Sequence, residues 1–106
     1  MLPYNIDLTG KTILVTGAAG FIGSNLVKRL LNDFEPIKVI GIDSITDYYD
    51  VNLKNERLKE IESLSKDWAF IRGSIADKTL IEQVFTENKI DVVVNLAAQA
   101  GVRYSI

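Results

Sequence analysis

Apolar residues recur along this chain with two alternating periods. Short, almost continuous apolar runs are separated by longer stretches in which apolar side chains return every three or four positions. The first pattern is typical of strands covered on both faces, and the second of amphipathic helices. The two patterns predict strands at residues 13–15, 38–43, 68–71 and 90–95, and helices at residues 21–34, 51–64 and 77–87.

Each predicted helix has one apolar face. Pro36 cannot continue the first helix, and Asp77 is a suitable N-cap for the third. The side chains expected to face the core are, in chain order, Ile22, Leu26, Val27, Leu30 and Leu31, then Leu58, Ile61 and Leu64, then Leu80, Ile81, Val84 and Phe85.

Strict alternation of strands and helices predicts right-handed β-α-β units and therefore a parallel sheet of the α/β class. With 106 residues, the chain forms one domain at most. No internal repeat, low-complexity tract or linker interrupts the alternation.

A glycine-rich turn joins the first strand to the first helix. Gly17, Gly20 and Gly23 follow the apolar run with the spacing Gly-x-x-Gly-x-x-Gly. A strand, a tight turn and a helix start together form an arrangement that holds phosphate on backbone N–H groups. In such a site Gly17 allows the turn, Gly20 lets a pyrophosphate approach the main chain, and Gly23 lets the helix pack close to the strand. Taken alone, the turn is equally explained as a plain strand–helix connection.

Asp43 favours the nucleotide interpretation. It ends the second predicted strand, 20 residues after Gly23. A dinucleotide-binding fold places the acceptor for its ribose hydroxyls at this spacing. A carboxylate there repels a 2′-phosphate, and no arginine follows before Arg57, so the sequence predicts NAD rather than NADP as cofactor. The simpler alternative is that Asp43 caps the turn before Ser44. The fold is then a Rossmann-type doubly wound sheet with strand order 3-2-1-4, and the ligand crevice lies between strands 1 and 4.

Small residues follow the last strand, in the segment from Asn95 to Gly101. They would form the other side of the same crevice, although a close helix–sheet contact explains them equally well.

Composition narrows the remaining chemistry. The formal net charge is −2, with 12 basic and 14 acidic residues, which argues against a nucleic-acid partner. The chain has no cysteine and no histidine, so thiolate metal sites and histidine acid–base catalysis are excluded within it. No signal peptide or membrane-spanning stretch is recognised, and we expect a cytoplasmic location and no metal site.

These motifs together resemble the N-terminal part of an extended short-chain dehydrogenase/reductase, within the NAD-dependent nucleotide-sugar epimerases and dehydratases. The resemblance rests on residues 16–23, on Gly41-Ile42-Asp43 and on Leu96-Ala97-Ala98-Gln99. Residues 47–54 and 99–105 are similar to the UDP-glucuronate 4-epimerase branch. The resemblance covers essentially everything from Lys11 onward.

The resemblance implies a role for each segment. Backbone around Ala19, Gly20, Phe21 and Ile22 would hold the pyrophosphate, and Asp43, helped by Ser44, the adenosine ribose. Ser74 and Ile75 would border the adenine, although the family often has an acidic residue at the position of Ser74. The nicotinamide-side ribose would contact Leu96, Ala97, Ala98 and Gln99, and the sugar-nucleotide pocket would be edged by Gly101, Val102 and Arg103. An equally simple interpretation of Arg103 is a solvated side chain.

The family's catalytic Tyr-x-x-x-Lys pair does not occur in this chain. We therefore expect residues 1–106 to be the N-terminal part of an NAD-binding domain, a fragment that is inactive alone. The resemblance implies that the parent enzyme epimerises a UDP-sugar such as UDP-glucuronate at C4 and forms a homodimer. A dehydratase or reductase of the same superfamily is the alternative enzyme. A non-catalytic NAD-binding module is the alternative. The fourth strand would leave an open parallel edge, through which the fragment would self-associate.

Overall fold

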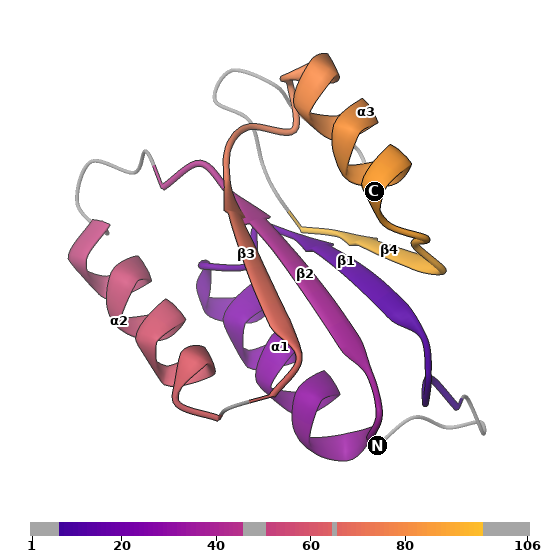
Figure 1. Cartoon of the computed structure of the whole chain (residues 1–106). Coiled ribbons are helices and arrows are strands. Elements are labelled where there is room, and N and C mark those ends of the chain that lie inside the picture. Colours follow the sequence, from indigo (N-terminus) through magenta and orange to yellow (C-terminus); the bar gives the residue numbers. More distant parts are fainter. Residues whose placement is uncertain (1–6, 46–50, 65, 97–106) are drawn as a thin grey trace.

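The computed structural model describes residues 7–45, 51–64 and 66–96. Seven elements alternate along the chain, as the hydrophobic pattern predicts (Figure 1). They are β1 (Thr12–Thr16), α1 (Phe21–Asp33), β2 (Lys38–Asp43), α2 (Val51–Glu62), β3 (Trp68–Arg72), α3 (Lys78–Glu87) and β4 (Val92–Asn95). Half of the bounds agree with the expected ones, and the others differ by one or two residues.

The four strands form one parallel sheet in the order β3-β2-β1-β4, which confirms the predicted topology. The central pair is β1 and β2, with Leu14 opposite Ile40. On its other side β1 pairs with β4, where Leu14 lies opposite Val93. In the described part of the chain β4 has no strand on its outer side, so self-association through this edge stays a prediction.

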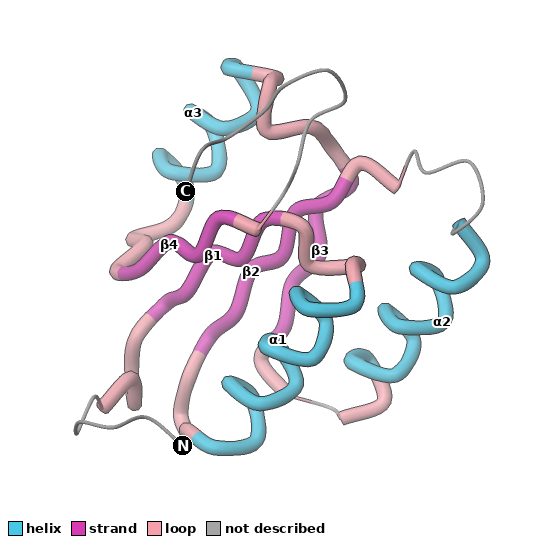
Figure 2. The backbone as a smooth tube through the Cα atoms, turned by 180° about the vertical axis from the view of Figure 1, so that it is seen from behind, coloured by secondary structure: helices cyan, strands magenta, loops and turns pink. Residues whose placement is uncertain are grey.

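Helices cover both faces of the sheet, as a doubly wound fold requires. Figures 1 and 2 show α1 and α2 on one face and α3 on the other. The larger core lies under α1 and α2, where Val27, Leu31 and Ile61 pack on Ile13 and Val39. A smaller core lies under α3, where Val84 packs with side chains of β1 and β2 such as Leu14 and Ile40. The sheet centre is therefore apolar on both sides.

Two side chains predicted to face the core are exposed instead. Ile22 is 69% exposed, because the buried stripe of α1 runs through Gly23 and Val27, one position later on the helix. Phe85 is 46% exposed, because Val84 takes the buried position of α3 and Phe85 lies at the flank.

The ends of the helices follow local chemistry. The side chain of Asp77 accepts a hydrogen bond of 3.1 Å from the backbone N–H of Leu80, which confirms the predicted N-cap of α3. The first helix ends before the predicted residue 34, since Phe34 is its C-cap and Pro36 lies beyond. By contrast, Gly20 caps α1 without any side-chain hydrogen bond. The capping residue therefore leaves the first backbone N–H groups of α1 without a side-chain partner.

Candidate functional site

The carboxyl ends of the four strands are tied together by backbone hydrogen bonds. The N–H of Gly17, just after β1, donates to the carbonyl of Ile42 in β2 at 2.8 Å. The N–H of Gly73, after β3, donates to the carbonyl of Asp43 at 3.1 Å. Loops that follow different strands therefore meet at one edge, where parallel α/β sheets bind their ligands.

The glycine turn has the geometry that its sequence predicts. Gly17 has a φ of +72°, a left-handed conformation that side chains with a Cβ rarely adopt. At Gly23 an added Cβ would lie 2.1 Å from the carbonyl oxygen of Gly17. Only glycine therefore lets the first turn of α1 approach the end of β1 so closely.

The start of α1 presents backbone N–H groups beside this turn. The first N–H groups of any helix lack intrahelical partners, and α1 has neither a side-chain cap nor an acidic residue in its first turn. The helix dipole adds partial positive charge at this end. Phe21 and Ile22, which supply these amides, are each 69% exposed. The arrangement suits an anionic group such as a phosphate.

Asp43 joins the end of β2 to the glycine turn. Its Oδ2 accepts from the N–H of Ala19 at 3.0 Å, and its Oδ1 accepts from the N–H of Ile45 at 2.9 Å. The ammonium of Lys54, in α2, lies 3.2 Å from Oδ1. Because Asp43 is only 6% exposed, these three donors replace the water that a carboxylate would otherwise bind.

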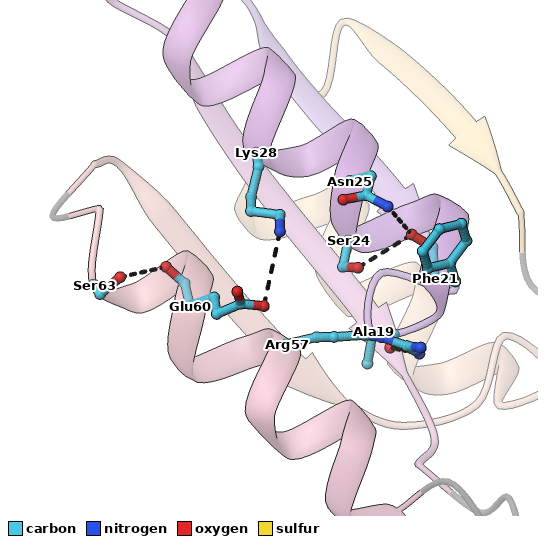
Figure 3. Close-up of polar contacts among 8 residues, drawn as sticks. All are labelled: Ala19, Phe21, Ser24, Asn25, Lys28, Arg57, Glu60 and Ser63. Atoms are coloured by element: carbon cyan, nitrogen blue, oxygen red, sulfur yellow. Dashed lines mark hydrogen bonds and ion pairs between the residues drawn. The ribbon is translucent and has the colours of Figure 1, made fainter.

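A second cation of α2 contacts the glycine turn directly. Arg57 donates from Nη1 to the carbonyl of Ala19 at 3.3 Å, and its guanidinium lies 5.8 Å from the centre of the Phe21 ring. Figure 3 shows this side chain crossing from α2 to Ala19 and Phe21. Ala19 is thus fixed through its N–H by Asp43 and through its carbonyl by Arg57.

Three further contacts hold α1 in place, one to α2 and two within the helix. Lys28 and Glu60 form an ion pair of 3.8 Å between the two helices (Figure 3). Within α1, the hydroxyl of Ser24 and the amide of Asn25 both donate to the carbonyl of Phe21. The backbone that bears the first amides of α1 is therefore anchored from several directions.

The ends of β1 and β4 are linked through Thr16. Its hydroxyl donates to the side-chain carbonyl of Asn95 at 2.5 Å and accepts from the N–H of Leu96 at 3.0 Å. Thr16 was not among the predicted site residues. A polar residue directly after the apolar run 13–15 was the available signal.

The predicted adenine-side residues lie after β3. The hydroxyl of Ser74 accepts from the N–H of Ala76 at 3.0 Å, and so belongs to the turn that starts α3. Ile75 packs against the smaller core. Ser44, next to Asp43, is partly buried. These positions lie at the carboxyl edge of the sheet near Asp43. The link is the hydrogen bond from the N–H of Gly73 to the carbonyl of Asp43.

Several predicted residues lie outside the described part of the chain. They are Ala97, Ala98 and Gln99 of the nicotinamide-side segment, and Gly101, Val102 and Arg103 of the sugar-nucleotide segment. Their predicted roles stay predictions.

Sequence reasoning missed the two cations of α2. Lys54 and Arg57 are three positions apart, so they share one face of the helix. That spacing is visible in the sequence, but only the packing of α2 beside the glycine turn brings both to the site.

Other features of the described residues lie apart from this edge. A cavity of about 410 Å³ opens at the amino ends of β1 and β2, where Lys11, Thr12 and Lys38 line it. Within residues 7–45, 51–64 and 66–96, no group of three acidic, cysteine or histidine side chains could hold a metal ion. No helix in those ranges is long and apolar enough to cross a bilayer.

Comparison with known proteins identifies the family. The sequence matches the family described as GDP-mannose 4,6 dehydratase over residues 14–106. It is 50% identical over 94 residues to protein CapI of Staphylococcus aureus, covering 89% of this chain and 27% of that protein. The chain thus spans less than a third of this relative's length.

Solved structures of relatives share the fold of this chain and resemble it in sequence. The dTDP-glucose 4,6-dehydratase of Bacillus anthracis, in complex with NAD, superposes with a TM-score of 0.74 at 40% identity, covering 86% of this chain and 28% of that one. The UDP-glucuronic acid 4-epimerase of Bacillus cereus, in complex with UDP-glucuronic acid and NAD, gives a TM-score of 0.70 at 41% identity, covering 87% and 28%. The chain belongs to the extended short-chain dehydrogenase/reductase family of NAD-dependent epimerases and dehydratases.

Proposed function

We propose that residues 1–106 form the NAD-binding portion of a nucleotide-sugar epimerase that inverts C4 of a UDP-sugar such as UDP-glucuronate. The observation that carries the proposal is the start of α1. There an uncapped helix end meets a turn closed by Gly17, Gly20 and Gly23, and Asp43 is bonded to the same turn. The complexes of two relatives with NAD support the choice of cofactor.

The residues present fit a dinucleotide. The amides of Phe21 and Ile22 would bind the pyrophosphate, and Gly20, which has no Cβ, leaves the backbone open to it. Asp43 would accept from the hydroxyls of the adenosine ribose. Ser74 and Ile75 would border the adenine, and Leu96 would begin the segment along the nicotinamide-side ribose. When bound, NAD supplies reversible hydride transfer at its nicotinamide ring.

The chain's own residues bind and orient rather than catalyse in this proposal. Arg57 and Asp43 fix Ala19 before the cofactor arrives, so the amides of the turn are preorganised. Preorganisation raises affinity because less conformational freedom is lost on binding. The family's catalytic Tyr-x-x-x-Lys pair is not among these residues.

Calorimetric titration of the 106-residue chain with NAD tests the proposal. We expect saturable binding at one site, and at least about tenfold weaker binding for Gly20→Ala. At Gly20 the added methyl would lie 3.3 Å from the carbonyl oxygen of Gly17, and the backbone φ of −73° accepts alanine. The methyl would therefore obstruct the pyrophosphate more than the fold.

Asn32→Ala is the matched control, because Asn32 is an exposed residue near the far end of the same helix. It should bind NAD like the wild type. No binding by the wild-type chain, or equal binding by Gly20→Ala, would contradict the proposal.

A dehydratase acting on a nucleotide sugar is the second candidate. The likeness to the Bacillus anthracis dehydratase, at a TM-score of 0.74 and 40% identity, supports it about as well as the likeness to the epimerase, at 0.70 and 41%, supports the first candidate. Incubating the expected parent enzyme with UDP-glucuronate and with dTDP-glucose separates the two. The C4 epimer of the first substrate supports the epimerase, whereas a 4-keto-6-deoxy product from the second supports the dehydratase.

A further inference from the structure

A buried ion pair occupies the point where the adenosine ribose is expected. The Lys54 ammonium and the Asp43 carboxylate are 3.2 Å apart, and their side chains are only 13% and 5% exposed. A carboxylate has about four lone-pair sites. Three of them already accept hydrogen bonds, from Ala19, Ile45 and Lys54.

A ribose diol would need two of those sites, so one existing donor has to yield or share. The amides of Ala19 and Ile45 belong to backbone that is fixed by the glycine turn and by the end of β2. Lys54 is different, because its ammonium is on a flexible stem and has three donors. Lys54 is therefore the partner that moves, and its positive charge stays close to the ribose.

The pair also changes the electrostatic argument for NAD over NADP. A lone carboxylate repels the 2′-phosphate of NADP, whereas a carboxylate paired with an ammonium has no net charge. Arg57 adds a second positive charge from the same helix face, next to Ala19. The ribose end of the crevice therefore repels a phosphate less strongly than Asp43 alone would.

We propose that Lys54 is a specificity-determining residue: by offsetting the charge of Asp43, it lowers the discrimination of this site against NADP. This inference rests on the proposed function, since it presumes that the ribose binds at Asp43. Lys54 acts in two ways, competing with the ribose hydroxyls for Asp43 and attracting a 2′-phosphate. Both effects reduce the preference for NAD.

The test measures dissociation constants for NAD and NADP by calorimetry and compares their ratio among variants. Lys54→Met should raise the ratio of the NADP to the NAD constant by at least about tenfold. Asp43→Asn, which leaves Lys54 without its carboxylate, should lower the same ratio. Lys59→Met is the control, because it removes the same charge from an exposed position of α2. Its ratio should equal that of the wild type.

A merely structural role for Lys54 would weaken both cofactors together and leave the ratio unchanged. If Lys54→Met does not fold by circular dichroism, Lys54→Gln keeps a hydrogen-bond donor without the charge and should raise the ratio in the same direction. A ratio within about twofold of wild type in a folded Lys54 variant would overturn the inference. Failure of the wild-type chain to bind either cofactor would instead overturn the proposed function.

Discussion

Ala19 and Asp43 are joined by a hydrogen bond of 3.0 Å between the backbone N–H of the first and the carboxylate of the second. The bond links the glycine turn after β1 to the end of β2, two segments 24 residues apart in the chain. The residue expected to hold a ribose thus also holds the turn expected to bind the pyrophosphate. The two halves of the predicted site are therefore one connected unit.

Gly23→Ala should destabilise the chain by about 3 kcal/mol, because its Cβ would lie 2.1 Å from the carbonyl oxygen of Gly17. Gly10→Ala is the comparison. Gly10 has a φ of +77° but nothing within 4 Å of an added Cβ, so only conformational strain of about 1–2 kcal/mol is expected. Urea denaturation followed by circular dichroism measures both. Equal losses would show that close packing at Gly23 is unimportant.

Thr16→Val tests the link between β1 and β4. The substitution keeps the shape of the side chain but removes the hydroxyl that bonds to Asn95 and Leu96. A loss of about 1–2 kcal/mol in the free energy of unfolding is expected, with faster hydrogen exchange at the Leu96 amide. Thr86→Val, on the exposed side of α3, should change stability by less than about 0.5 kcal/mol. A free energy of unfolding that Thr16→Val leaves unchanged would argue against the link.

The Glu35–Lys66 pair predicts a measurable titration. The hydrogen bond from the Lys66 ammonium, at 2.6 Å, and its positive charge hold the pKa of Glu35 below the ordinary value of 4.5. Because the folded pKa is lowered, the pair's contribution to stability is present above about pH 4.5 and is lost as the pH falls through the folded pKa. Both side chains are near the surface, so salt should weaken the effect.

Lys66→Met should raise the pKa of Glu35 toward 4.5 in an NMR titration. Asp7 is an internal control, since the hydrogen bond from Thr9 lowers its pKa without help from Lys66. Its titration should not change. A Glu35 pKa that stays low in the variant would contradict the assignment of the pair.

Much of the fold could be predicted because it depends on local chemistry. The apolar runs located the strands, and the N-cap at Asp77 and the left-handed turn at Gly17 follow from those residues alone. Ile22 was placed wrongly because a helical stripe indicates a face only to within about one position.

The site was less predictable because its charges come together through tertiary packing. The spacing of Asp43 from the glycines indicated a carboxylate at the crevice. It did not show that Lys54 and Arg57 would reach the same turn from α2. Those contacts depend on how α2 packs beside α1, which no local pattern encodes.

The central claim is that the carboxyl edge of the sheet binds NAD, and amide chemical shifts during an NAD titration of the ¹⁵N-labelled chain test it most directly. We expect the largest shifts at Gly20, Phe21 and Ile22, with further shifts at Gly73 and Leu96. Residues at the opposite edge, such as Thr12 and Lys38 beside the amino-end cavity, should not shift. Shifts concentrated at that cavity, or none at the glycine turn, would contradict the account.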